Sequence, residues 1–163
     1  MIRAIASVGF VGLIPFAPGT FGSLAALPGA WVLHALGGFP LLAAATLLVF
    51  VLGLWAVGKL PPGSDHDPSW VVIDEVAGQW IALFPLSAGL WYAGAAPWTF
   101  PWPGWVGAFL MFRLFDIWKP WLVGRADALP GPLGVMLDDV VAGVLAALAV
   151  ALAAAVAHGA FGA

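Results

Sequence analysis

The charged residues of this chain are few, and they lie in short clusters between long apolar segments. Its 163 residues include five Lys and Arg and eight Asp and Glu, so 8% of the chain is charged and 63% is hydrophobic. A soluble domain carries about 25% charged residues. Uncharged stretches of about 20 residues are long enough to cross a bilayer as helices. The pattern predicts one all-α, integral-membrane domain that occupies residues 1–163.

About five apolar segments have the length expected of membrane spans. We predict these spans at about 20–37, 40–58, 70–93, 105–119 and 134–158. Residues 4–16 are too short to cross a bilayer before Pro15, so we expect a re-entrant or interfacial segment there, on a side that the sequence leaves open. Thr20 and Ser23 are expected to cap the first span. Polar loops are predicted at 60–69 and 121–133, and an aromatic turn at 94–104.

Strict alternation of the spans brings the charged clusters to one side of the membrane. Apart from Arg3, the clusters are Lys59 with Asp65 and Asp67, Asp74-Glu75, Arg113/Asp116/Lys119, Arg125/Asp127 and Asp138-Asp139. Each lies where a span returns to this side or leaves it. The turns at 38–40 and 94–104, on the other side, contain no Lys or Arg. By the positive-inside rule, the charged side faces the cytoplasm.

The acidic pairs on this side suggest a site for a hard metal ion. Eight carboxylates face four cationic side chains, which leaves a charge of 4 − 8 = −4 before any ligand binds. Adjacent acids beside an apolar interior repel one another unless a cation compensates them. Oxygen ligands without cysteine favour Mg²⁺ or Mn²⁺ over Zn²⁺. Asp74-Glu75 and Asp138-Asp139 therefore become candidate ligands for one or two ions. The alternative is that they merely complement the helix dipole.

Two further features suit a phosphate bound beside such an ion. Arg113, Asp116 and Lys119 recur at three-residue spacing, which predicts two cations flanking a carboxylate on one helix face. Snorkelling of the cations at a helix end is the alternative. The turn at 18–23 opens a helix, and its amides, with the hydroxyls of Thr20 and Ser23, could hold an anion. Ordinary helix capping explains that turn equally well.

Small residues follow the acidic pairs at helical spacing. Gly78 lies four residues after Asp74, and Gly143 lies four residues after Asp139. Small residues on helix faces allow backbones to approach closely in membranes. Gly and Ala are also common in apolar helices without such a role, and the sequence does not separate the two interpretations.

Four stretches of the chain, in this order, resemble the bacterial phosphatidylglycerophosphatase A family. They are Pro18-Gly19-Thr20-Phe21-Gly22-Ser23-Leu24-Ala25, Val72-Ile73-Asp74-Glu75-Val76-Ala77-Gly78-Gln79-Trp80, Phe112-Arg113-Leu114-Phe115-Asp116-Ile117-Trp118-Lys119-Pro120-Trp121 and Gly134-Val135-Met136-Leu137-Asp138-Asp139-Val140-Val141-Ala142-Gly143. Two departures, Gly131-Pro132 and Trp121-Leu122-Val123, fall in the loop at 121–133 and leave the shape of that loop open.

The resemblance implies a Mg²⁺-dependent phosphatase with a central helix surrounded by others. It would convert phosphatidylglycerophosphate to phosphatidylglycerol and phosphate at the cytoplasmic face of the bacterial inner membrane. On this basis we expect Asp74, Glu75, Asp138 and Asp139 to hold Mg²⁺. We expect Arg113, Lys119, Thr20 and Ser23 to bind the phosphate, and Asp116 to act with Asp139 in catalysis. Whether Asp116 is the nucleophile or the base that activates water stays open.

Other classes of function fit the sequence less well. A net charge of −3 without a basic run argues against a nucleic-acid partner. An ion or proton transporter with intramembrane carboxylates is the main alternative. Such a relay requires acids at several depths and a path to both faces, whereas the predicted spans gather the acids at one face. Asp65-His66-Asp67 resembles a phosphatase Asp-x-Asp motif, but no βαβ pattern surrounds it.

Overall fold

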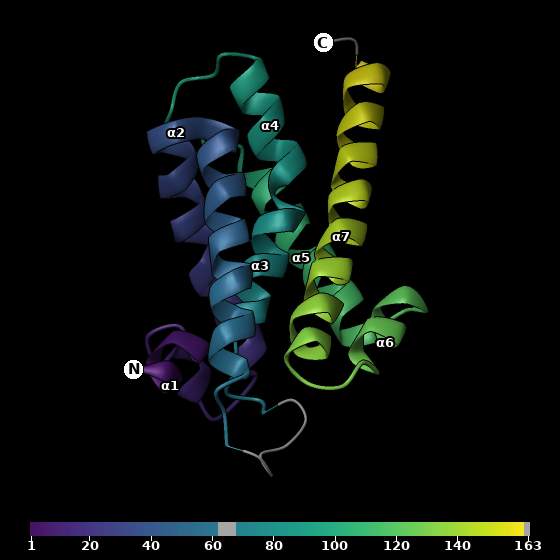
Figure 1. Ribbon diagram of the computed structural model, residues 1–163. Coiled ribbons are helices and arrows are strands. Elements are labelled where there is room, and N and C mark those ends of the chain that lie inside the picture. The colour runs from purple at the N-terminus through teal and green to yellow at the C-terminus, as the bar shows by residue number, and fades with distance from the viewer. Residues whose placement is uncertain (62–67, 162–163) are drawn as a thin grey trace.

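The computed structural model describes residues 1–61 and 68–161, and all regular elements in these two ranges are helices (Figure 1). The Asp65-His66-Asp67 cluster lies outside the described residues. The predicted all-α class is confirmed for the part of the chain that is described. The helices are α1 (Ile2–Ala6), η1 (Val11–Leu13), α2 (Pro18–Val57), α3 (Ile73–Ala82), α4 (Phe84–Tyr92), α5 (Trp102–Trp118), α6 (Leu122–Asp127) and α7 (Pro132–Phe161).

Helix α2 is a hairpin of two helical legs. Gly37 and Gly38 have non-helical backbone angles, and the φ of +63° at Gly38 suits glycine because it has no Cβ. Figure 1 shows the two legs meeting at one end of the molecule. Residues of both legs, including Ala26 and Leu42, belong to one hydrophobic cluster. The hairpin places the start of α2 and its end at the same end of the fold, as the alternation of the spans predicts.

Helix α3 forms the centre of the fold. Eight of its ten residues are buried, and it packs against both α2 and α7. After Leu83 the chain continues as α4, so the predicted span at 70–93 consists of two short helices. The indole nitrogen of Trp80 donates a hydrogen bond of 2.8 Å to the carbonyl oxygen of Ala26 on α2. This bond joins the central helix to the hairpin.

Two helices are long and apolar enough to be candidate membrane spans. They are α2, in which an 18-residue stretch has a mean hydropathy of 2.3, and residues Pro132–Ala157 of α7, in which such a stretch has a mean hydropathy of 2.7. The prediction of five spans is not supported, because α3, α4 and α5 have 10, 9 and 17 residues. In these stretches of α2 and α7, 28% and 22% are buried inside the described chain. These two helices indicate a membrane protein.

The N-terminal segment lies at the end of the fold where α3 begins. Residues 4–16 contain the end of α1 and the short helix η1. The backbone amide of Val72 donates a hydrogen bond of 2.9 Å to the carbonyl oxygen of Ala6. The segment therefore lies against the residues that lead into α3.

The region at 121–133 differs from the predicted loop because it contains helix α6. Helix α5 ends at Trp118, and Lys119 adopts a left-handed conformation with φ +46°, which turns the chain before Pro120. Val123 and Ala126 of α6 are buried, and α6 packs against α7. A six-residue helix of this kind is stabilised by tertiary packing rather than by its own helix propensity. The sequence therefore predicted a loop here, because Pro and Gly residues surround the segment.

Candidate active site

Four helix ends meet around one polar cavity. The starts of α2, α3 and α7 and the end of α5 enclose a volume of about 300 Å³. The predicted site residues that line it are Thr20, Asp74, Glu75, Arg113, Asp116, Lys119, Asp138 and Asp139. Ser23 is fully buried and does not line the cavity. The fold thus brings together residues that lie up to 119 positions apart, from Thr20 to Asp139.

A glycine contact between α3 and α7 sets the position of the acids. An added Cβ at Gly143 would lie 2.4 Å from the carbonyl oxygen of Gly78, and one at Gly78 would lie 2.5 Å from that of Asp139. Both contacts are with backbone atoms, so the two helices cross at the closest approach that glycine allows. This crossing is one turn beyond Asp74 and Asp139. Close packing is therefore the interpretation that the structure supports for these two glycines.

We expect Gly143→Ala to separate α3 from α7 and to lower both stability and phosphatase activity. A methyl group 2.4 Å from a carbonyl oxygen forces a backbone shift, and overpacking of this kind costs about 1–3 kcal/mol. Thermal unfolding in detergent and phosphate release measure the two effects. Gly89→Ala is the matched control, because a Cβ at Gly89 in α4 meets nothing within 4 Å. Equal behaviour of the two variants would contradict the proposed role of the crossing.

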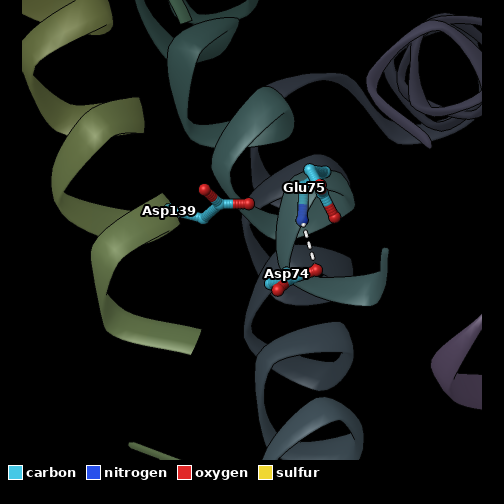
Figure 2. A group of neighbouring side chains, drawn as sticks. All are labelled: Asp74, Glu75 and Asp139. Atoms are coloured by element: carbon cyan, nitrogen blue, oxygen red, sulfur yellow. Dashed lines mark hydrogen bonds between the residues drawn. The ribbon is translucent and has the colours of Figure 1, made fainter. Parts of the chain in front are cut away.

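Five carboxylates form two overlapping groups in the cavity. Carboxylate oxygens of Asp74, Glu75 and Asp139 lie within 4.8 Å of one another, and so do those of Asp116, Asp138 and Asp139. Figure 2 shows Asp139 reaching from α7 towards Asp74 and Glu75 on α3. The backbone amide of Glu75 donates a hydrogen bond of 3.0 Å to Asp74 Oδ1. Asp139 is the acid that belongs to both groups.

Several buried oxygens in these groups fit a bound cation. Glu75 Oε2 and Asp139 Oδ2 are buried, and neither oxygen accepts a hydrogen bond from any residue that the structure describes. A buried carboxylate oxygen without a donor is costly unless a cation compensates it. Asp74 and Asp139 are only 6% and 3% exposed, so water compensates little of this charge. An all-oxygen set of this kind suits a hard divalent ion.

Arg113 is held in the cavity from two sides. Its Nη1 lies 2.5 Å from Asp116 Oδ2, one turn further along α5, and donates a longer hydrogen bond of 3.4 Å to Ser23 Oγ. The Ser23 hydroxyl in turn donates to the carbonyl oxygen of Gly19 at 2.9 Å. Arg113 Nε is buried and has no acceptor among the described residues. The guanidinium is therefore oriented by protein groups and retains a donor for a ligand.

Lys119 has different partners from those expected. It pairs with Asp127 of α6 and lies 2.8 Å from Asp138 Oδ2, whereas the sequence placed Asp116 between Lys119 and Arg113. The reason is that α5 ends before Lys119, which breaks the three-residue spacing. Burial by itself lowers the pKa of Lys119, but Asp127 and Asp138 outweigh this effect and raise it above its usual value. Lys119 therefore carries its charge at every physiological pH.

The start of α2 also differs from the prediction. The helix begins at Pro18, with Ala17 as the N-cap residue, and no side chain caps it. The prediction that Thr20 and Ser23 act as caps is therefore wrong, because both lie inside the helix. The backbone amides of Thr20 and Phe21 donate to the carbonyl oxygen of Ala17, so they are already used. The Thr20 side chain remains at the cavity wall for a ligand.

Two contacts at the site, one of Gly19 and one of Asp127, were not predicted from the sequence. Gly19 lies against Glu75, since a Cβ there would come within 2.2 Å of Glu75 Oε1. Asp127 holds Lys119 from α6. The presence of Asp127 in a charged cluster on the predicted site face was an available signal. No signal in the sequence identified the contact of Gly19, because it depends on how α2 meets α3.

The fold and the cavity define a class of protein. It is an all-helical chain, over the residues described, with two apolar candidate spans and an acidic cavity bordered by Arg113 and Lys119. Clustered ionisable groups of this kind, in a chain otherwise so apolar, mark a functional site.

The chain belongs to the phosphatidylglycerophosphatase A family, whose family model matches residues 4–154. It is 37% identical over 145 residues to phosphatidylglycerophosphatase A of Escherichia coli, covering 86% of this chain and 77% of that protein. It is 36% identical over 148 residues to phosphatidylglycerophosphatase A of Haemophilus influenzae, covering 88% and 83%. A protein of Bacteroides thetaiotaomicron named as a candidate phosphatidylinositol-3-phosphatase is 40% identical over 150 residues, covering 87% and 86%. No solved structure matches.

Family membership confirms the resemblance inferred from the four stretches of sequence, and it identifies the chain as an enzyme of the phosphoric monoester hydrolase class. The matched range contains all the predicted site residues, from Thr20 to Asp139.

Proposed function

We propose that this protein is a Mg²⁺-dependent phosphatase that hydrolyses phosphatidylglycerophosphate to phosphatidylglycerol and inorganic phosphate. The observation that carries the proposal is the cavity, in which five carboxylates lie beside an oriented arginine in a chain of this family. A phosphate monoester needs both a cation-binding site and positive charge for its oxygens. The cavity offers groups for both.

Asp74, Glu75, Asp138 and Asp139 are the proposed ligands of Mg²⁺. Support comes from the two groups of carboxylate oxygens within 4.8 Å and from the buried oxygens of Glu75 and Asp139 that lack a donor among the described residues. When bound, the ion would neutralise the phosphoryl oxygens and stabilise the charge of the in-line transition state. Lys119 already pairs with Asp138, so this ligand is shared between the ion and a protein cation.

Arg113 and Lys119 are the proposed phosphate-binding groups. The planar guanidinium of Arg113 matches phosphate geometry, and its Nε has no acceptor among the described residues. Lys119 adds a second positive charge on the cavity wall. Thr20 contributes its side chain directly, whereas Ser23 acts by holding Arg113 in place. These residues would orient the phosphate against the carboxylates.

Asp116 is the proposed nucleophile or general base. It lines the cavity, contacts Arg113 and belongs to the second group of carboxylates. As a base it would take a proton from water while the water oxygen bonds to phosphorus and the bond to the glycerol oxygen breaks, and this proton would then pass to the glycerol oxygen. As a nucleophile it would bond to phosphorus itself while the bond to the glycerol oxygen breaks and that oxygen takes up a proton, and water would then hydrolyse the phospho-aspartate to Asp116 and phosphate. Both routes end in phosphatidylglycerol and phosphate.

The proposed setting is a multi-pass protein of the bacterial inner membrane with the cavity at the cytoplasmic face. The two legs of α2 and helix α7 supply apolar lengths that suit this arrangement. Lys59 follows the end of α2 and Arg125 lies on α6, and Figure 1 shows the end of α2 and α6 at the end of the fold opposite residues 93–101, which contain no Lys or Arg. A lipid head group at this surface would reach the cavity from the bilayer. No observation favours the alternative of an ion transporter.

We expect phosphate release from phosphatidylglycerophosphate in detergent micelles to require Mg²⁺ and to fall by at least about 10²-fold in Asp74→Asn. The change keeps the shape of the side chain and removes its charge. Phosphatidylinositol 3-phosphate is the comparison substrate, since one relative carries a name of that kind. Faster release from that lipid would move the proposal to another head group. Release that is independent of Mg²⁺ would overturn the metal assignment.

A further inference from the structure

A second pocket lies at the end of the fold that holds the active-site cavity, between α1 and the residues that follow α2. It has a volume of about 490 Å³ and shares no lining residue with the active-site cavity. Figure 1 shows α1 beside the lower end of α2. We call it the basic pocket, and the described residues that line it are Ile2, Arg3, Lys59, Leu60, Pro61 and Trp70.

Two cations of the basic pocket have no acidic partner among the described residues. Arg3 and Lys59 are exposed, and neither forms an ion pair with an acid in residues 1–61 or 68–161. By contrast, Arg113 and Lys119 are both paired with acids. The guanidinium carbon of Arg3 lies 5.5 Å from the centre of the Trp70 ring, which orients this cation over an aromatic surface. The pocket thus combines two positive charges with an apolar wall.

We propose that the basic pocket binds the phosphate group of an anionic phospholipid. Arg and Lys supply the charge that a phosphodiester recognises, and Arg binds phosphate oxygens through its planar fork. Trp70, Ile2 and Leu60 supply the apolar contacts that the glycerol and the first acyl carbons of a lipid would use, and a soluble phosphate would leave them without a partner. Tryptophan is also typical of the membrane interface, where these phosphates lie.

The bound lipid would stabilise the segment around Trp70, which leads into the central helix α3. An added Cβ at Gly12 would lie 2.1 Å from the carbonyl oxygen of Trp70, so η1 packs directly on this segment. Val72 is hydrogen-bonded to Ala6 of α1, and Asp74 follows two residues later. A lipid held between Arg3 and Trp70 would therefore stabilise the approach to the metal-binding acids from outside the cavity. The proposal requires a membrane protein but not the proposed phosphatase activity.

The test measures binding of phosphatidylserine to the purified protein in neutral detergent, by native mass spectrometry over a range of lipid concentrations. Phosphatidylserine is anionic but is neither the proposed substrate nor the proposed product, so its binding reports on the pocket rather than on turnover. We expect the double variant Arg3→Gln, Lys59→Gln to bind it at least roughly tenfold more weakly than the wild type. Phosphatidylcholine should bind weakly to both proteins.

Arg125→Gln is the matched control. Arg125 is exposed, lies on α6 outside both cavities and has no ion-pair partner among the described residues. The variant should bind phosphatidylserine like the wild type. An equal loss in Arg125→Gln would overturn the proposal in favour of general charge attraction. Unchanged binding in the double variant would overturn it as well, and displacement by glycerol 3-phosphate at similar concentrations would exclude a lipid as the ligand.

The single variant Lys59→Gln distinguishes a loss of lipid binding from misfolding of the double variant. Lys59 is exposed and makes no ion pair with the described residues, so its replacement leaves the packing of α1 intact. We expect it to show a smaller loss of phosphatidylserine binding than the double variant. A Lys59→Gln protein that binds the lipid like the wild type would contradict the assignment of Lys59.

Discussion

Asp139→Asn is expected to reduce phosphate release by about 10³-fold and to weaken its dependence on Mg²⁺. Asp139 belongs to both groups of carboxylates, so its loss disturbs every proposed ion position at once. Asn is close to Asp in size, and Asp139 is 3% exposed, so the change removes charge and leaves the packing intact. The measurement is kcat from phosphatidylglycerophosphate over a titration of Mg²⁺.

Asp127→Asn is the control for this prediction. Asp127 belongs to neither group of acids, does not line the cavity and pairs with Lys119, which does. Asp127→Asn removes the same negative charge as Asp139→Asn, so a general electrostatic effect would lower the activity of both variants. We expect a much smaller loss of activity in Asp127→Asn, with the Mg²⁺ dependence unchanged. Full activity of Asp139→Asn with an unchanged response to Mg²⁺ would show that the metal assignment is wrong.

Arg113→Gln is expected to lower kcat by about 10³-fold, the lower end of the effect of an arginine that stabilises a phosphoryl transition state. Its guanidinium is oriented by Asp116 and Ser23, and Nε has no acceptor among the described residues. Such a preorganised charge contributes most when negative charge develops on the phosphoryl oxygens. Steady-state kinetics on phosphatidylglycerophosphate micelles separate the effect on kcat from the effect on KM.

Arg113→Lys and Ser23→Ala refine this second prediction. Lys keeps the charge but lacks the planar fork, so we expect activity between those of the wild type and Arg113→Gln. Ser23→Ala removes only the hydroxyl partner of Arg113, and its effect should be the smallest of the three. If Arg113→Gln kept the activity of the wild type while Ser23→Ala lost it, the hydroxyl rather than the guanidinium would be the group that binds phosphate.

Much of the site could be predicted because scarce charge is informative in an apolar chain. Asp74-Glu75 and Asp138-Asp139 were identified from their type and position, and the alternation of apolar segments placed them at one end of the fold. The structure brings these four acids to one cavity together with Arg113 and Asp116. Ionisable residues are energetically costly in an apolar fold, so those without a role in a functional site are rare there. This cost explains why the acids gather in one cavity.

Local details were predicted less well because they depend on contacts between helices. The start of α2, the helix α6 and the partners of Lys119 all differ from the prediction. Each is decided where one helix ends against another. Pro18 starts α2 without a capping side chain, and α6 forms because Val123 and Ala126 are buried. The spacing of residues within one segment of the sequence does not predict such contacts between helices.

The sequence by itself determined the helical class, the apolar character and the acids of the candidate site. These properties are local, since composition and the distance between charges are read along the chain. Only the tertiary structure decided that Gly143 meets Gly78, that Asp139 joins two groups of acids, and that Lys119 pairs with Asp127 and Asp138. Those pairings depend on the depth and angle at which packed helices cross, and close packing sets both only when all the helices are in place.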